Sequence, residues 1–229
     1  RSRMLRAIFG ADPVRGGTVL VNGVPANCSN PGNAARSGIG LLTEDRKESG
    51  VLPELTLREN VAIAGYRTIA TRGWLSNGRI KDYVEKSLKS LGVKYHSVDD
   101  PITARSGGNQ QKALIARWMA MGAKVLLLDE PTKGVDVGAK ADIYAAVSNM
   151  ARNGMGFLVV SSYLPEVLGL CDRILVVKDH AVVGDVPALG ATEESIMHTA
   201  SIATAHKLES ATPTPDSDHP SASGSSDGE

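Results

Sequence analysis

Apolar and polar positions along this chain follow two periods, one typical of strands and one typical of helices. Short apolar runs, several bounded by turn residues, predict strands at 18–21, 39–42, 125–128, 157–160, 174–177 and 181–186. Apolar spacing and capping residues predict helices at 2–9, 30–37, 56–64, 79–91, 110–121, 139–150, 165–170 and 193–200. From residue 110 onward, helices and strands alternate. This order predicts an α/β fold with a mostly parallel sheet flanked by helices, and 181–186 as an antiparallel edge.

Three short signals mark where elements turn or begin. Asn22-Gly23 is a dipeptide typical of a tight β-hairpin. Asn30-Pro31 combines a helix cap with a first-turn proline. Thr56 followed by Glu59 matches a capping box. Beyond Lys207 the chain is rich in Ser, Thr, Pro, Asp and Gly without apolar periodicity, so we predict a disordered tail.

Composition narrows the functional classes. Lys and Arg number 25 and Asp and Glu number 25, so the charge balance gives no reason to expect nucleic acid or an anionic membrane as a partner. Aromatic residues make up only 4%, which argues against base stacking. Cys28 and Cys171 form neither a disulfide framework nor a metal cluster, which fits a reducing cytosol. No apolar run approaches the length of a membrane span, so we expect any membrane association to come through a partner protein.

The most informative stretch is the apolar run 125–128, which leads directly into Asp129, Glu130 and Pro131. A buried strand of a parallel sheet delivers such carboxylates to the sheet's carboxyl edge, where ligands of open α/β sheets bind. There Asp129 is well placed to hold Mg²⁺, which prefers hard oxygen ligands. Glu130 could orient or deprotonate an attacking water. The alternative is that these residues merely begin a loop.

A second candidate site is the turn Ser106-Gly107-Gly108, which opens the helix at 110–121. Glycines let backbone N–H groups approach an anion, and the helix that follows adds its positive end. The Ser106 hydroxyl adds a donor. The alternative is a flexible helix entry. Because the turn precedes the acidic strand by some twenty residues, the two together predict a nucleotide site more strongly than either alone.

Three blocks carry a resemblance to a known family. Ser106–Lys112, Val125–Thr132 and Gly134–Lys140 resemble the SGGNQQK, LDEPT and GVDVGAK blocks of monosaccharide ABC importers of the ribose, galactose and xylose type. The match is to the second cassette of their fused two-cassette ATPase subunit. Gly38–Gly40, Glu44–Lys47 and Ser161–Val167 fit that half as well, and the resemblance extends from Arg1 to about Ala200.

The resemblance implies a role for each matching residue. The signature residues would bind the γ-phosphate of ATP held by an opposing cassette; they are Ser106, Gly107, Gly108, Asn109 and Gln110. Asp129 and Glu130 match the Walker B pair, which implies a metal-binding acid and a catalytic base. The remaining nucleotide-binding candidates are Asp136 in the D-loop, Glu44 at the Q-loop position, Ser162 at the switch-histidine position, and Arg1 and Ser2 at the end of a Walker A motif.

The phosphate loop itself is missing from this sequence. No Gly-Lys dipeptide occurs anywhere. We expect the chain to begin inside a degenerate Walker A motif, in which arginine replaces lysine, and to lack the N-terminal strands. We also expect the strand ending at Asp129 to be left with an open edge, and the isolated chain to be inactive. The alternative is a complete protein that never needed the loop.

The resemblance implies a P-loop NTPase-like ABC cassette core over 1–205, with a helical subdomain at about 57–100 and a disordered tail at 206–229. The implied function is an ATP-binding subunit that couples ATP hydrolysis to carbohydrate uptake, mainly by supplying its signature to a partner cassette. ATP and Mg²⁺ are the implied cofactors. The implied partners are a homologous or fused first cassette, a transmembrane sugar permease and, indirectly, a substrate-binding protein, at the cytoplasmic face of the membrane. The alternative is a non-catalytic interaction module. A non-transport ABC ATPase is a third possibility, disfavoured by the importer-like signature.

Overall fold

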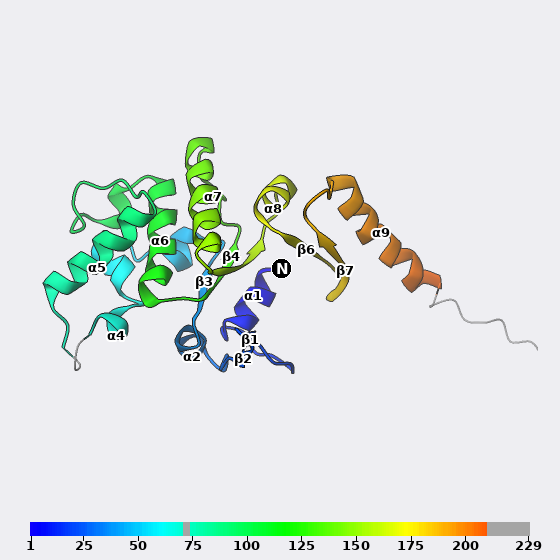
Figure 1. The fold of residues 1–229 in the computed structure, drawn as a ribbon, viewed down its shortest axis with the longest axis horizontal. Coiled ribbons are helices and arrows are strands. Elements are labelled where there is room, and N and C mark those ends of the chain that lie inside the picture. Colours follow the sequence, from blue (N-terminus) through cyan, green and yellow to red (C-terminus); the bar gives the residue numbers. More distant parts are fainter. Residues whose placement is uncertain (71–73, 210–229) are drawn as a thin grey trace, which may run out of the picture. The chain divides into compact units, whose positions relative to one another are not determined.

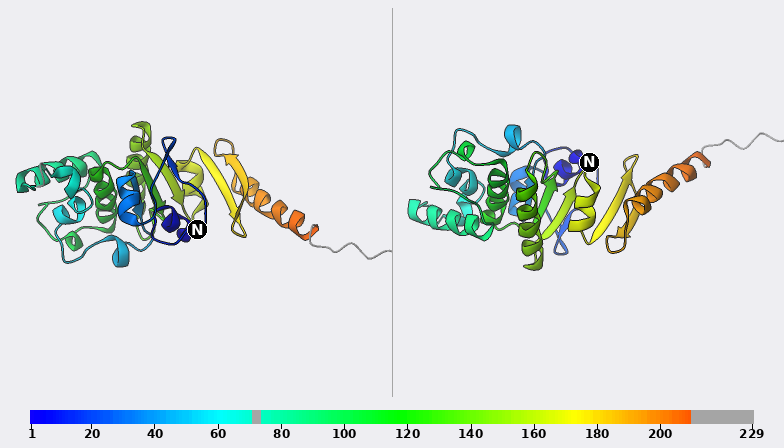
Figure 2. Two further views of the ribbon diagram at one scale, coloured as in Figure 1. Left: turned by 90° about the horizontal axis from the view of Figure 1, so that it is seen from below. Right: turned by 90° about the horizontal axis from the view of Figure 1, so that it is seen from above.

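The computed structural model describes residues 1–70 and 74–209, and Figures 1 and 2 show the arrangement of its elements. The chain divides into two compact units, one from Arg1 to Cys171 and one from Asp172 onward. In the described part, no helix is both long enough and apolar enough to cross a membrane.

A parallel three-stranded sheet forms the centre of the first unit. Its order is β3 (Ile39–Leu42), β4 (Val125–Asp129) and β5 (Gly156–Val160). The pairing runs in one register, with Ile39 opposite Val125 and Val125 opposite Gly156. Because β4 pairs on both sides, our expectation of an open edge beside Asp129 is wrong. In this three-stranded sheet, among the described residues, the unpaired edges belong to β3 and β5, because β4, apolar from Val125 to Leu128, takes the central position.

Helices cover both faces of this sheet. They are α1 (Ser2–Ile8), α2 (Pro31–Arg36), α6 (Gly107–Met121), α7 (Val137–Arg152) and α8 (Leu164–Leu170). Side chains of a strand point alternately to opposite faces. Accordingly, Leu126 and Leu128 pack in the core that includes α6 and α7, whereas Leu127 packs with Leu5 of α1. A short hairpin, β1 (Leu20–Val21) and β2 (Val24–Pro25), joins α1 to α2.

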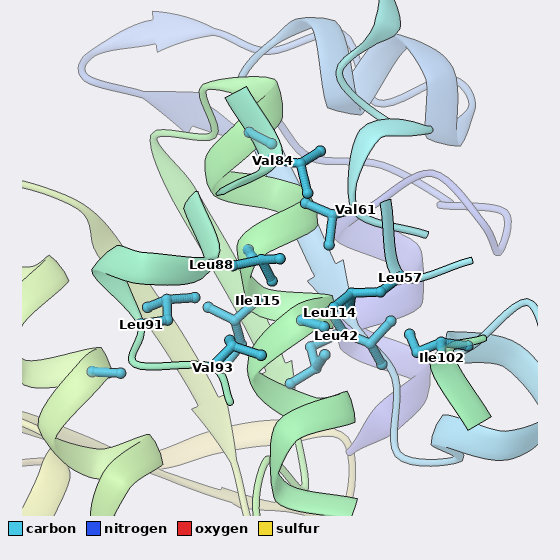
Figure 3. Close-up of a cluster of buried hydrophobic side chains, with 14 of the residues drawn as sticks. Leu42, Leu57, Val61, Val84, Leu88, Leu91, Val93, Ile102, Leu114 and Ile115 are labelled. Carbon is cyan, nitrogen blue, oxygen red and sulfur yellow. The ribbon is translucent and has the colours of Figure 1, made fainter. Parts of the chain in front are cut away.

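The segment between β3 and α6 forms a small helical layer. It contains α3 (Leu57–Ala62), α4 (Tyr66–Ile69) and α5 (Asn77–Ser90). The ends of the segment are joined to each other, because Leu57 N donates to Asp100 O at 2.9 Å and Arg58 N donates to Val98 O at 2.8 Å. Figure 3 shows how α6 supplies Leu114 and Ile115 to the apolar cluster between these helices. Helix α6 therefore connects the helical layer to the sheet.

The second unit is a hairpin with one helix. Strands β6 (Arg173–Lys178) and β7 (Ala181–Pro187) pair antiparallel, and α9 (Glu193–Glu209) packs on them. Ile174, Val176 and Ile196 are the buried apolar residues of this contact. Gly184 leaves no room for a Cβ against Thr199, so this position needs glycine.

Most element predictions from the sequence are confirmed. Every predicted strand and helix occurs, each within a few residues of its expected bounds except the last helix, which is nine residues longer than predicted, and the capping box at Thr56 and Glu59 forms in both directions. Asn22 and Gly23 both have positive φ, as a tight hairpin requires. The pattern did not predict α4, a π-helical turn at Arg46–Gly50 or a 3-10 turn at Ile102–Ala104. Helix α9 continues to Glu209, past the predicted start of the tail; residues 210–229 lie outside the described residues.

Candidate functional site

The carboxyl edge of the sheet brings a serine and an aspartate together. Strand β4 ends at Asp129, whose side chain is only 4% exposed. Helix α1 packs against β4 through the fully buried Leu5 and holds Ser2 at its first turn. The Ser2 hydroxyl donates to Asp129 Oδ1 at 3.0 Å. Two of the predicted site residues, 127 positions apart in sequence, are thus in direct contact.

Burial raises the pKa of the Asp129 carboxyl, and the hydrogen bond from Ser2 partly counteracts this rise. A hydroxyl and a carboxylate oxygen at one point are hard ligands of the kind that suits Mg²⁺. Among residues 1–70 and 74–209, no group of three or more His, Cys, Asp or Glu side chains could hold a metal ion. Ser2 and Asp129 could supply two oxygen ligands to an Mg²⁺ ion.

Glu130 follows β4 in an unusual backbone conformation. Its φ is +49°, in the left-handed region, which is costly for a residue with a Cβ. Its N–H still donates to Val160 O at 2.8 Å, which ties the turn to β5. Its carboxylate Oε2 accepts a hydrogen bond from the Ser162 hydroxyl at 3.0 Å. The predicted base and the residue at the switch position therefore face each other.

Charged residues surround this edge. Lys133 Nζ lies 2.6 Å from Glu44 Oε1 in an exposed ion pair, and this hydrogen bond raises the pKa of the Lys133 ammonium. The Glu44 charge also acts on Asp129, where it adds to the rise in pKa. Arg1 Nη1 lies 3.5 Å from Ser161 O. Hence Arg1, Ser2, Glu44, Asp129, Glu130 and Ser162 gather at one end of the sheet. We call these six residues the edge group.

The signature turn forms a second group at the start of α6. Ser106 is the exposed N-cap residue, and its Oγ accepts from Asn109 Nδ2 at 2.9 Å. Gly108 is buried against Ala139 of α7 and has no room for a Cβ. Because Asp136 caps α7 through Ala139 N at 2.9 Å, this close packing brings the N-termini of α6 and α7 together. We call Ser106–Gln110 with Asp136 the signature group.

The side-chain amides of Asn109 and Gln110 also make hydrogen bonds within the protein. Asn109 Oδ1 accepts from Lys94 N at 2.9 Å, so its amide links the turn to the helical layer. Gln110 Nε2 donates to Arg105 O at 3.0 Å. Gly108 serves helix packing, a role that sequence reasoning did not anticipate. The hydroxyl of Ser106 and the backbone of Gly107 remain the parts of the turn best suited to meet a ligand.

Sequence reasoning missed several contacts around the site. Thr132 Oγ1 donates to Glu166 Oε1 at 2.8 Å, and both residues are at most 4% exposed. This pair joins the loop after β4 to α8. Lys133 lies in the same loop, and Arg46 lies against the signature turn. Hydropathy carries no signal for such pairs, because each depends on contact between distant segments.

The first unit combines a parallel sheet, which carries acids at its carboxyl edge, with a helical layer. The helix that follows this layer, α6, begins at a glycine turn. Together these features define an ATP-binding cassette of the P-loop NTPase-like type. Solved structures agree on this fold. A cassette solved as a dimer in a post-hydrolysis state with ADP and Pi matches with a TM-score of 0.68 at 22% identity, covering 82% of this chain and 80% of that one. Another ABC transporter cassette matches with a TM-score of 0.69, covering 91% of this chain and 83% of the other.

The chain belongs to the ABC transporter family, whose model matches residues 1–133. The ribose import ATP-binding protein of Rubrobacter xylanophilus is 44% identical over 198 residues, which are 86% of this chain and 40% of that protein. The corresponding protein of Bacillus subtilis is 41% identical over 197 residues, again 86% of this chain and 40% of the relative. The chain thus spans about two fifths of the length of the curated relatives it matches.

Proposed function

We propose that this chain is part of the ATP-binding component of a monosaccharide importer and that it supplies its signature turn to ATP held by a partner cassette. The observation that carries this proposal is the exposure of Ser106 at the start of α6, on elements separate from the Ser2–Asp129 pair. The hydroxyl, the adjacent backbone N–H groups and the positive end of a 15-residue helix together suit a phosphate group that approaches from outside.

The edge group suits a different role within the same cycle. Ser2 and Asp129 would hold Mg²⁺, which when bound draws negative charge from phosphate oxygens. Glu130 accepts a hydrogen bond from Ser162 and could orient or deprotonate a water. Ser162 is less suited than a histidine to the switch position, because a serine hydroxyl does not take up a proton near neutral pH. We therefore expect ATP hydrolysis at the chain's own edge group to be slow. Most ATP would be hydrolysed at the partner's site, which Ser106 completes.

ATP-driven association and release of the two cassettes would then drive a membrane sugar permease, to which a substrate-binding protein delivers the sugar. In this proposal the chain acts at the cytoplasmic face of the membrane, held there by the permease. The ribose import relatives support a sugar of this class.

The test replaces Ser106 by arginine in the assembled transporter and measures ATPase activity and sugar uptake. A bulky cation at this position would fill the space where we expect the phosphate, so both activities should fall at least about tenfold, the cost of losing a preorganised anion contact. Ser76→Arg is the matched control, because Ser76 is also an exposed helix N-cap serine and makes no cap hydrogen bond. Unchanged activity in Ser106→Arg would refute the assignment.

A second candidate function is a non-catalytic module that docks on a permease or on a complete cassette. The serine at the switch position, Ser162, favours it, because a serine hydroxyl does not take up a proton near neutral pH. Mixing the chain with a complete first cassette separates the two proposals. Gain of ATPase activity on mixing, lost again in Ser106→Arg, supports the first, whereas binding without any gain supports the second.

A further inference from the structure

The π-helical turn Arg46–Gly50, with Glu44 just before it, touches both groups of site residues. Glu44 pairs with Lys133, which follows the acidic pair at the end of β4, at 2.6 Å. Two residues later, Arg46 Nη1 donates to Gly107 O at 3.1 Å. One short segment after β3 therefore joins the edge group to the signature turn through side-chain contacts.

The guanidinium of Arg46 lies directly on Gly107. A Cβ built on Gly107 would come within 3.0 Å of Arg46 Nη2, so the absence of a side chain at this glycine makes room for the arginine. Arg46 Nε is buried and has no hydrogen-bond partner among the described residues. Burial lowers the pKa of this guanidinium. Such a partly buried cation differs from an ordinary surface arginine, whose head group stays in water.

The other end of the same turn is also fixed on α6. Gly50 O accepts from Arg117 Nη1 at 2.9 Å, and Gly50 packs against Leu114. The turn is therefore held at two points along α6, by Arg46 at the first residue of the helix and by Arg117 near its last turn. Glu44 and the start of α6 are therefore linked through this turn.

We propose that Arg46 is a positioning residue that sets the placement of the Ser106–Gly107 turn and couples it to the Glu44 segment. This inference rests on the proposed function, because it assigns a partner within the protein to the turn that would grip ATP. In this arrangement Gly107 has two uses: its N–H would be open to phosphate, and its Cα face contacts the Arg46 guanidinium, which a Cβ would displace slightly.

The first test measures amide hydrogen exchange in the assembled transporter. It compares the wild-type protein with the Arg46→Met variant. Loss of one hydrogen bond from a charged donor predicts that amides of the peptide spanning 105–112 exchange about tenfold faster, while the remainder of α6 is unchanged. Lys47→Met is the matched control, because Lys47 is exposed, lies next to Arg46 and carries the same charge. Equal exchange in both variants would overturn the inference.

The second test measures the apparent KM for ATP and kcat. A displaced turn should raise KM about tenfold in Arg46→Met, with melting temperatures equal to those of Lys47→Met; a purely structural loss would instead lower kcat with the fraction of folded protein. Gly107→Ala should push Arg46 away and give the same phenotype. The double variant Arg46→Met with Gly107→Ala should then be no worse than the more severe single variant, whereas additive losses would contradict a shared mechanism.

These outcomes separate the inference from the proposed function. If Ser106→Arg leaves ATPase activity unchanged, the proposed function fails. If Ser106→Arg abolishes activity while Arg46→Met behaves like Lys47→Met in both exchange and KM, only the role of Arg46 fails.

Discussion

Arg117 offers a quantitative test of how the helical layer is attached to the sheet. Its guanidinium leaves α6 and donates to Asn60 O at 2.7 Å, to Asn60 Oδ1 at 3.1 Å and to Gly50 O at 2.9 Å. Asn60 O belongs to the last turn of α3, where backbone carbonyls lack helical partners and a cation is favourable. A single side chain thus fixes both α3 and the turn before it on α6.

The loss in free energy of unfolding expected for Arg117→Met follows from these contacts. Burial lowers the pKa of Arg117 to about 10, well below its usual range, so taking this charge out of water costs roughly 3 kcal/mol. Arg117→Met removes that cost but leaves the Asn60 and Gly50 carbonyls without this donor. Each unsatisfied carbonyl costs about 1–3 kcal/mol. Because part of the desolvation cost is returned, we expect a net loss of about 3 kcal/mol.

The assay is urea unfolding followed by tryptophan fluorescence. Trp118 is adjacent to Arg117 and partly buried, whereas Trp74 is 82% exposed and should change little on unfolding. A loss of about 3 kcal/mol corresponds to a urea midpoint lower by about 1–3 M, because the slope m is about 1–3 kcal/mol/M. Arg152→Met is the control, because Arg152 is exposed on α7 and makes one bond to Ser148 O; its effect should stay within about 0.5 kcal/mol. Equal effects of the two variants would refute the reasoning.

Three further predictions concern the last residue of β4 and the residues just after it. Asp129→Asn should stabilise the chain by about 1 kcal/mol at pH 7 while removing a ligand of the proposed metal site. Because burial raises the folded-state pKa of Asp129, the wild type loses stability as pH rises above 3.8 and through that raised pKa, so the advantage of the variant should shrink in urea titrations near pH 4. Glu130→Gly should be about 1 kcal/mol more stable than Glu130→Ala by thermal melting, because only glycine adopts φ +49° without strain; equal stability would contradict this. Thr132→Val should cost about 2 kcal/mol in denaturant unfolding because the buried Glu166 carboxylate loses its donor, and Thr132→Ser should restore the loss; failure of the serine variant to do so would argue against the hydrogen bond.

The strands and helices could be predicted because their signals are local. The apolar run 125–128 and the helical spacing of 79–91 are short-range patterns, and β4 and α5 form there. The sequence also predicts that acids meet at the sheet edge, because parallel strands share one carboxyl edge. The order of strands within the sheet has no such local signal. The composition of β4 does not reveal which strands become its neighbours, and our expectation of an open edge there was wrong.

The contacts around the signature turn could not be predicted from the sequence. Arg46 reads as an exposed basic residue in a charged loop, and only the folded chain brings it onto Gly107, 61 positions away. Gly107 and Gly108 look equivalent in sequence, yet Gly108 is buried on Ala139 while Gly107 faces Arg46. Such assignments depend on side-chain packing between distant segments, which carries no periodic signal.

The edge group and the signature group differ in how much they destabilise the folded chain. This difference bears on their roles. Asp129 is a buried acid with a raised pKa, and Glu130 holds a left-handed backbone conformation. Both are features that selection for stability alone would remove, and such features concentrate at reactive sites. Within the signature turn, Ser106 caps its helix and Gly108 packs tightly, so neither residue is strained; the partly buried Arg46 beside the turn, whose Nε has no partner among the described residues, is the exception. It follows that substitutions at 129–130 should lower activity and raise stability. Ser106→Arg should remove activity with no gain in stability. This is expected if the signature turn acts only when the nucleotide of a partner cassette reaches it.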